Sequence, residues 1–183
     1  MSRVFLAAAR RSAVVPKGGA FAALALHDLA APVITGVLQD ARVSGGEVGE
    51  LIVSNALGAG GNPARLAALA AGLPLHVAGL SIDRQCAGGL DALLLAAAMI
   101  RAGQHEIVVA GGVESYSRRP LRLRTFPDGR PPEAYDAPPF APDPARDPDM
   151  AKAADDLGRK LGISRAEQDD WAVQSHHKAR ASA

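Results

Sequence analysis

The chain has 183 residues, and its 20 Lys and Arg against 19 Asp and Glu leave a formal net charge of +1, which indicates neither a nucleic-acid nor a membrane partner. Hydrophobic residues make up 48% and charged residues 21%, as in ordinary globular proteins. One cysteine and five scattered histidines exclude an internal disulfide and show no metal-ligand spacing, so we expect no metal. The apolar run at 4–9 is too short for a signal peptide, and we therefore expect a protein of the reducing cytoplasm.

Strands and helices alternate along the first 119 residues, which we expect to form one α/β domain. The hydrophobic patterns and breakers predict strands at 4–6, 50–54, 76–82 and 107–110, and helices at about 24–42, 63–72 and 87–102. This order predicts a mostly parallel sheet with helices covering both faces. Pro32 within the first helix predicts either a late start or a kink there. The helix at 87–102 is apolar nearly all round, which predicts that it is buried.

The composition changes after Pro120, because nine of the 13 prolines lie between Pro120 and Pro148. We expect a proline-rich loop over 120–149 and a helical segment over 150–183. A helix should run from Met150 to about residue 161, and a capping box of Ser164 and Glu167 should begin a second helix. We expect Trp171 to anchor that second helix.

Cys86 is the strongest candidate for a chemical role, because it lies where a predicted strand passes into a predicted helix. The positive end of a helix dipole stabilises a thiolate, which is the nucleophilic form of cysteine. Gly88 and Gly89 follow, and each is about 1 kcal/mol less favourable in a helix than alanine, which indicates close approach by a substrate or a neighbouring backbone. The alternative is a small buried hydrophobe, as most free cysteines are. The local chemistry leaves both interpretations open.

Four ordered motifs resemble the thiolase family. They are Gln85-Cys86-Ala87-Gly88-Gly89-Leu90, Gly61-Asn62-Pro63-Ala64-Arg65, the segment 108–115 (Val-Val-Ala-Gly-Gly-Val-Glu-Ser), and the segment 161–169 together with Ser175-His176. The resemblance covers nearly the whole chain except the proline-rich segment. It implies a thiolase-like N-terminal domain with a mostly parallel, mixed sheet covered by helices on both faces. A partial loop domain would follow, in a family whose complete fold has five αβαβα layers built from two similar halves.

The resemblance also implies a function. Thiolases transfer acyl groups between a 3-ketoacyl-CoA and coenzyme A, or run the reverse Claisen condensation, and Cys86 matches the position that carries the acyl group. A thiolate suits this role because it attacks a carbonyl and leaves again as part of a thioester. Met150 matches a position that lines the acyl and pantetheine pocket, although it can equally be a core residue at a helix start. Coenzyme A would be a substrate, with no bound cofactor.

This sequence departs from the family pattern in two respects. Thiolases place an activating histidine and a second cysteine in their C-terminal half, and here the second cysteine is absent. Biosynthetic thiolases place a histidine just before the residue that matches Met150, where this chain has Asp149, which weakens the expectation of acetoacetyl-CoA as substrate. We interpret His176 and His177 as a solvated helix face and Glu114 as a residue of loop architecture.

Three interpretations of function remain at this point. The first is the nucleophile half of a thiolase, in a homo-oligomer or with a C-terminal-half partner chain. The second is a catalytically incomplete subunit that binds CoA thioesters or a protein partner. The third is a ketosynthase, which shares the doubled fold and the cysteine nucleophile, although the motifs after Cys86 and at 163–169 favour a thiolase.

Overall fold

The computed structural model describes residues 3–58 and 61–182. The chain divides after Leu121 into two compact units, and each is described by itself. No helix in the described ranges is long and apolar enough to span a membrane.

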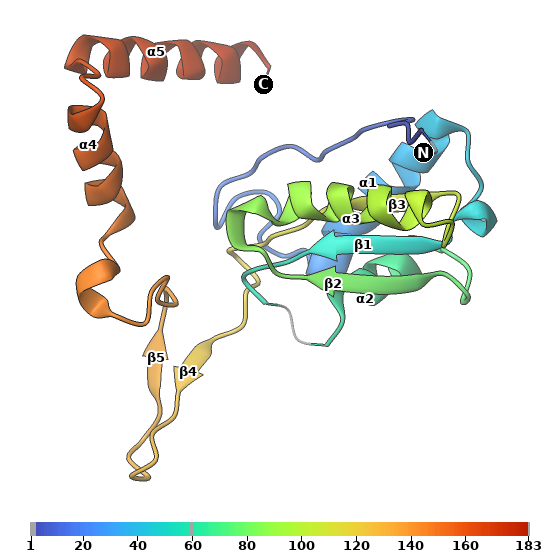
Figure 1. The fold of residues 1–183 in the computed structure, drawn as a ribbon, viewed down its shortest axis with the longest axis horizontal. Helices are drawn as coiled ribbons and strands as arrows, with labels where there is room; N and C mark the ends of the chain where they lie inside the picture. Colours follow the sequence, from blue (N-terminus) through green and yellow to red (C-terminus); the bar gives the residue numbers. More distant parts are fainter. Residues whose placement is uncertain (1–2, 59–60, 183) are drawn as a thin grey trace. The chain divides into compact units, whose positions relative to one another are not determined.

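The first unit contains a three-stranded parallel sheet (Figure 1). Its strands are β1 (Glu50–Ser54), β2 (Ala78–Ile82) and β3 (Val108–Gly112), in the order β2-β1-β3. Ser54, the last residue of β1, lies opposite Ile82 on one side and Gly112 on the other. The predicted mostly parallel sheet is therefore confirmed, and its three strands end at one level.

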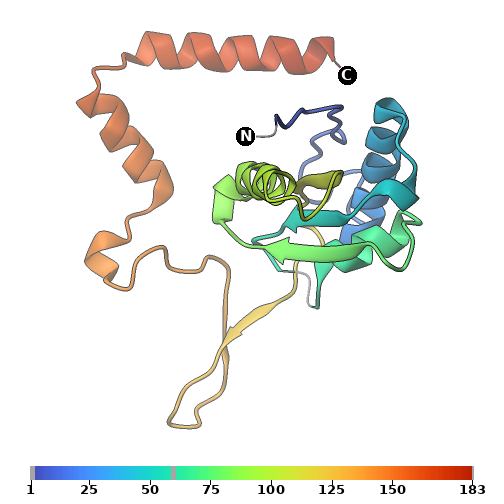
Figure 2. The same cartoon turned by 45° about the vertical axis from the view of Figure 1, so that its right-hand side comes forward.

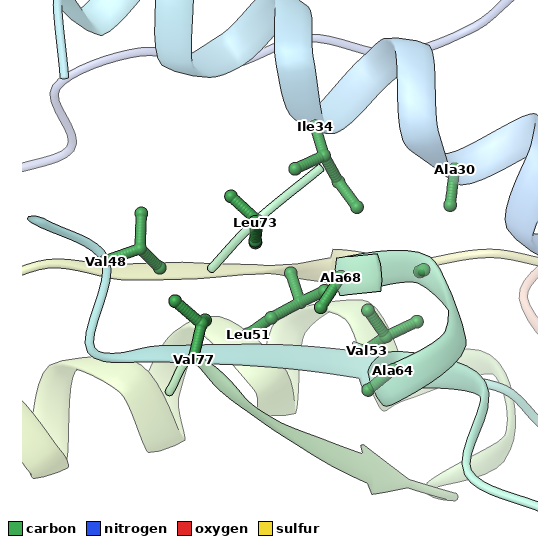
Figure 3. Packing of buried hydrophobic residues seen from close by; sticks show 10 residues of the cluster. Ala30, Ile34, Val48, Leu51, Val53, Ala64, Ala68, Leu73 and Val77 are labelled. Atoms are coloured by element: carbon green, nitrogen blue, oxygen red, sulfur yellow. The ribbon is translucent and has the colours of Figure 1, made fainter. Parts of the chain in front are cut away.

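Helices cover both faces of this sheet. Leu51 and Val53 point toward α1 (Leu26–Ala41) and α2 (Pro63–Ala70), whereas Ile52 between them contacts Ala92 and Ala96 of α3 (Gly88–Arg101). Figure 2 shows α3 on one side of the sheet and α1 and α2 on the other. The larger core cluster lies on the α1–α2 side, where side chains from both helices and β1 converge (Figure 3).

Local chemistry explains where α2 begins, and core packing explains why α1 tolerates a proline. The Asn62 side chain accepts a hydrogen bond from the Arg65 N–H at 3.0 Å, and Pro63 occupies the first helical position, as the sequence predicts. The helix α1 starts at Leu26 and passes through Pro32, so the late start considered for this helix is wrong. The aliphatic face of α1 packs on the core through Ala30 and Ile34, which stabilises the helix despite the missing proline N–H.

The strand predicted at 4–6 is wrong. Residues 3–16 form no regular secondary structure, and Phe5 is 73% exposed. A strand requires a neighbour for its backbone hydrogen bonds, and the described sheet contains only β1, β2 and β3. A side-chain contact connects residues 3–16 to α1 instead, because the Arg10 guanidinium donates a hydrogen bond to the Asp40 carboxylate at 2.9 Å.

The expectation that α3 is wholly buried is also wrong for this chain. Ala92 and Ala96 pack on the sheet, but Leu90 is 62% exposed and Leu94 is 60% exposed. A helix that is apolar all round has more apolar surface than one sheet face covers. The opposite side of α3 therefore forms an open apolar face, made of Leu90, Leu93 and Leu94.

The second unit contains a hairpin and two helices. The hairpin pairs β4 (Arg122–Arg124) with β5 (Glu133–Tyr135) in antiparallel register, and the helices are α4 (Met150–Lys160) and α5 (Arg165–Ala181). The proline-rich segment is thus more ordered than the predicted loop, because its prolines at 127, 131 and 132 lie in the connection between the strands. Both helices are as predicted, but Trp171 is 76% exposed, so the expectation that it anchors the second helix is wrong.

Candidate active site

Cys86 lies in a single 3-10 turn, Gln85–Ala87, between the end of β2 and the start of α3. Its side chain is exposed, so the interpretation as a small buried hydrophobe is wrong for this chain. The turn leads directly into the first residue of α3, Gly88. Cys86 is therefore presented at the amino end of a 14-residue helix, where the helix dipole favours a negative charge.

The residue before Cys86 has a strained backbone. Gln85 has φ of 50°, a left-handed conformation that costs a residue other than glycine roughly 1–2 kcal/mol. The Asp83 carboxylate accepts the Gln85 N–H at 2.9 Å, and the Arg84 carbonyl accepts the Ala87 N–H at 3.2 Å. These bonds hold the turn in a shape that Gln85 alone would not adopt, and strain of this kind is concentrated at functional sites.

An ion pair joins a residue before Cys86 to a residue after it in the chain. The Arg84 guanidinium lies 2.9 Å from the Asp91 carboxylate, which stands in the first turn of α3. Asp91 is thus the partner of Arg84, and its negative charge also suits the amino end of the helix. Because the Arg84 side chain is mostly exposed, the pair adds little to stability, and its main effect is to connect the two sides of the turn.

Close backbone packing lies beneath the turn. Gly88 rests on the buried Ser54, so closely that a Cβ on Gly88 would overlap the Ser54 hydroxyl. A Cβ on Gly112, at the end of β3, would lie 3.8 Å from the Cα of Gly89. The first turn of α3 therefore rests on the carboxyl ends of β1 and β3, which explains the glycine at position 88 through approach of a neighbouring strand. Open sheets of this type usually place their sites at these strand ends.

Glu114 connects the same two strand ends. Its carboxylate accepts hydrogen bonds from the Asn55 amide at 2.9 Å, from the Leu57 N–H at 3.2 Å, and from the Ala56 N–H. The Asn55 amide also donates to the Val113 carbonyl at 3.0 Å. The interpretation of Glu114 as loop architecture is confirmed, but the sequence could not show which loop it holds, because its partners lie 57–59 positions away.

The remaining candidate residues, and His105, belong to other elements of the chain. Met150 is the first residue of α4 in the second unit, where it is exposed rather than part of a core. His176 and His177 are exposed on α5, which confirms their interpretation as a solvated helix face. His105 packs closely on Gly49 and lies 3.9 Å from Glu50, beyond the opposite end of the strands from Cys86. Over residues 3–58 and 61–182, no group of three His, Cys, Asp or Glu side chains could hold a metal ion.

Comparison with known proteins adds independent support to these motifs. The thiolase N-terminal domain family matches residues 4–183. This chain belongs to the thiolase family. The resemblance carried by the four motifs is thereby confirmed.

Individual relatives of this thiolase-family chain agree with that assignment. A putative acetyl-CoA C-acetyltransferase of Bacillus subtilis, YhfS, is 43% identical over 154 residues, which cover 84% of this chain and 38% of the relative. A probable acetyl-CoA acyltransferase of Staphylococcus aureus is 36% identical, over 98% of this chain and 47% of the relative. The chain therefore spans less than half the length of these relatives.

A solved structure shows the same fold. The crystal structure of the Bacillus anthracis acetyl-CoA acetyltransferase matches with a TM-score of 0.82 and 35% identity, covering 96% of this chain and 47% of the other. The predicted thiolase-like α/β fold is therefore confirmed. The part of the thiolase fold seen here is the N-terminal part, with Cys86 at the start of its α3 helix.

Proposed function

We propose that this chain carries the nucleophile half of a thiolase-type acyl-CoA acyltransferase of cytoplasmic fatty acid metabolism. The observation that carries the proposal is the exposed Cys86, held in a strained turn at the amino end of α3 in the motif that resembles the thiolase nucleophile. The names of the relatives, acetyl-CoA C-acetyltransferase and acyltransferase, support coenzyme A thioesters as substrates.

The proposed reaction has two steps. The Cys86 sulfur attacks the C3 carbonyl carbon of a 3-ketoacyl-CoA, the bond between C2 and C3 breaks, and its electron pair leaves with the acetyl-CoA carbanion, which takes a proton from an acid. The acyl group remains on Cys86 as a thioester. The thiol of free coenzyme A then loses its proton to a base and attacks this thioester, which releases the shortened acyl-CoA and regenerates the Cys86 thiolate.

The residues of this chain would contribute only part of this chemistry. Cys86 would supply the nucleophilic sulfur, and Met150 would line the pocket for the acyl and pantetheine groups. The base and the acid would come from a C-terminal half, because the only cysteine here is the nucleophile itself. A positioned general base contributes about 10²–10⁴-fold to such rates, so we expect the 183-residue chain alone to be acylated slowly and to show little or no thiolysis turnover.

The test is acylation of the purified chain, followed by intact-protein mass spectrometry. After incubation with acetyl-CoA, we expect one acetyl adduct on Cys86, absent in the Cys86→Ser variant and removed by excess coenzyme A as acetyl-CoA forms. Coenzyme A binding without any adduct would favour the alternative, a subunit that binds CoA thioesters. Robust turnover by the chain alone would contradict the assignment of base and acid to another half.

A further inference from the structure

We propose that Glu114 is a positioning residue for Cys86, because its carboxylate joins the loop after β1 to the end of β3 and so fixes both contacts that support the first turn of α3. The inference rests on the proposed function of Cys86 as the nucleophile. It adds a residue that lies 28 positions beyond Cys86 in the sequence and on a different element.

The first step of the argument is the donor set around Glu114. An ionised carboxylate only accepts hydrogen bonds, and all three groups that face it are donors: the Asn55 amide and the Ala56 and Leu57 backbone N–H groups. Hydrogen bonds to an ionised acceptor are roughly twice as strong as neutral ones. A glutamine at this position would offer one oxygen instead of two and would turn an NH₂ group toward N–H donors.

The second step leads from this loop to α3. The loop begins directly after Ser54, the side chain that touches Gly88. The Asn55 N–H donates to the Ile82 carbonyl at 3.0 Å, and the Asn55 amide donates to Val113. The residue after Ser54 is therefore bonded to the ends of both neighbouring strands, and Glu114 secures the next two residues of the loop.

The third step leads from β3 to α3. Glu114 follows Gly112 by two residues, and Gly112 is the residue of β3 that approaches Gly89. The Val113 N–H donates to the Ser54 carbonyl at 3.0 Å, so the strand end is also bonded to β1. Glu114 therefore joins the loop after Ser54, on which Gly88 packs, to the strand end that lies near Gly89.

The consequence for Cys86 follows from its position. Cys86 precedes Gly88 by two residues, and the strained Gln85 turn persists only while its surroundings hold it. If Glu114 no longer bonds the loop after β1, the end of β1 is held less firmly, and with it the Ser54 side chain on which the first turn of α3 packs. The turn that carries Cys86 then loses its support, and Cys86 is no longer held at the amino end of α3.

The experiment measures the rate of Cys86 alkylation by iodoacetamide as a function of pH, which reports one site because the chain has one cysteine. The variants are Glu114→Gln and Glu114→Asp, and the matched control is Glu106→Gln, which removes the same charge from an exposed residue before β3. Melting temperatures show whether each variant is folded.

We expect Glu114→Gln to lower the alkylation rate at neutral pH by roughly two- to fivefold, because a thiolate that is no longer held at the amino end of α3 loses its interaction with the helix dipole, and to move the pH profile toward higher pH. Glu106→Gln should follow the wild type. Glu114→Asp keeps the carboxylate but is one methylene shorter, so it should give a smaller shift in the same direction and serves as the readout if Glu114→Gln does not fold. A purely structural role would lower the melting temperature and leave the pH profile unchanged, which would overturn the proposal.

Acetylation of the same samples by acetyl-CoA separates this inference from the proposed function. If the wild type is acetylated and the Glu114 variants keep its alkylation profile, the positioning role fails and the proposed function stands. If the wild type is never acetylated but the profile shifts in the Glu114 variants, the positioning role stands and the proposed function fails.

Discussion

Gly88 packs so closely on Ser54 that position 88 has no room for a side chain: a Cβ built on Gly88 would overlap the Ser54 hydroxyl oxygen and lie 2.6 Å from the Ser54 Cβ. Ser54 is buried at the end of β1, so it has little room to move. We therefore predict that Gly88→Ala lowers the free energy of unfolding by about 1–3 kcal/mol, measured by urea denaturation.

Two companion variants make this prediction specific. Gly89→Ala is the matched control, because a Cβ there meets no atom within 4 Å, and it should raise stability by up to about 1 kcal/mol through helix propensity. Adding Ser54→Gly to Gly88→Ala should recover part of the loss, whereas Ser54→Ala should recover less because its Cβ remains. Equal stability of Gly88→Ala and Gly89→Ala would contradict the close contact.

The strained turn before Cys86 makes a second prediction. Glycine adopts a left-handed conformation freely, so Gln85→Gly should remove the strain. The free energy of unfolding should rise by about 0.5–1 kcal/mol, which is what remains after the entropy that glycine loses on folding is subtracted. Urea denaturation gives the stability change. The released turn should also slow alkylation of Cys86, and a variant with both higher stability and faster alkylation would show that the strain does not hold the thiol. Gln85→Ala, which keeps a Cβ in the left-handed turn, is the control.

The open apolar face of α3 makes a third prediction. Contiguous exposed apolar side chains of this kind are covered in most soluble proteins, so we expect the chain to self-associate or to bind a hydrophobic dye at micromolar concentration. Leu94→Glu should reduce both effects, as measured by light scattering and dye fluorescence. The matched control is Leu75→Glu, which makes the same substitution at an exposed leucine outside α3. A monomeric wild type without dye binding would mean that the α3 face is covered in another way.

The capping box of α5 makes a fourth prediction, about pH. The Ser164 N–H and hydroxyl donate to the Glu167 carboxylate, each at 2.8 Å, and these bonds hold the pKa of Glu167 below its ordinary value. The hydrogen bond that the Arg165 side chain donates at 2.9 Å likewise lowers the pKa of Asp169. The folded helix start therefore binds fewer protons than the unfolded chain, and its stability is lost as the pH falls through the lowered pKa values.

Amide exchange provides the measurement for this fourth prediction. Protection of the Glu167 N–H, which donates to the Ser164 hydroxyl at 3.3 Å, should decrease on acidification once the intrinsic exchange rates are corrected for. Ser164→Ala should show low protection throughout the pH range. Protection that is independent of pH in the wild type would contradict the role of the ionised carboxylate.

Local signals in the sequence predicted the elements well. Asn62 with Pro63, and Ser164 with Glu167, begin helices through hydrogen bonds between near neighbours, so their effect is readable from the chain. The proline-rich hairpin was missed because its strands have three residues each, too few for an alternating pattern. Trp171 was misjudged because size and apolarity indicate a tendency to be buried, not the presence of a surface to bury against.

The candidate site was only half predictable. Cys86 and its motif could be identified from the sequence, because a cysteine before glycines at a strand-to-helix junction is a local pattern. The Gln85 conformation could not, because glutamine does not by itself indicate a left-handed backbone, and the Glu114 bonds could not, because they join residues brought together by strand pairing. Gly88 is recognisable from the sequence as unusual in a helix. Its contact with Ser54 is not, because Ser54 lies 34 positions earlier in the chain.

The level ends of the three parallel strands also constrain how the site assembles during folding. Parallel neighbours cannot be joined by a tight hairpin, so each pairing closes a long loop, and the Asn55–Glu114 contact joins positions 59 apart. The support beneath Cys86 is incomplete until β3 pairs with β1. The alkylation rate of Cys86 therefore reports when β3 pairs with β1. In a refolding chain, the reactivity of the native thiol should appear together with the slowest folding phase, after α3 itself has formed.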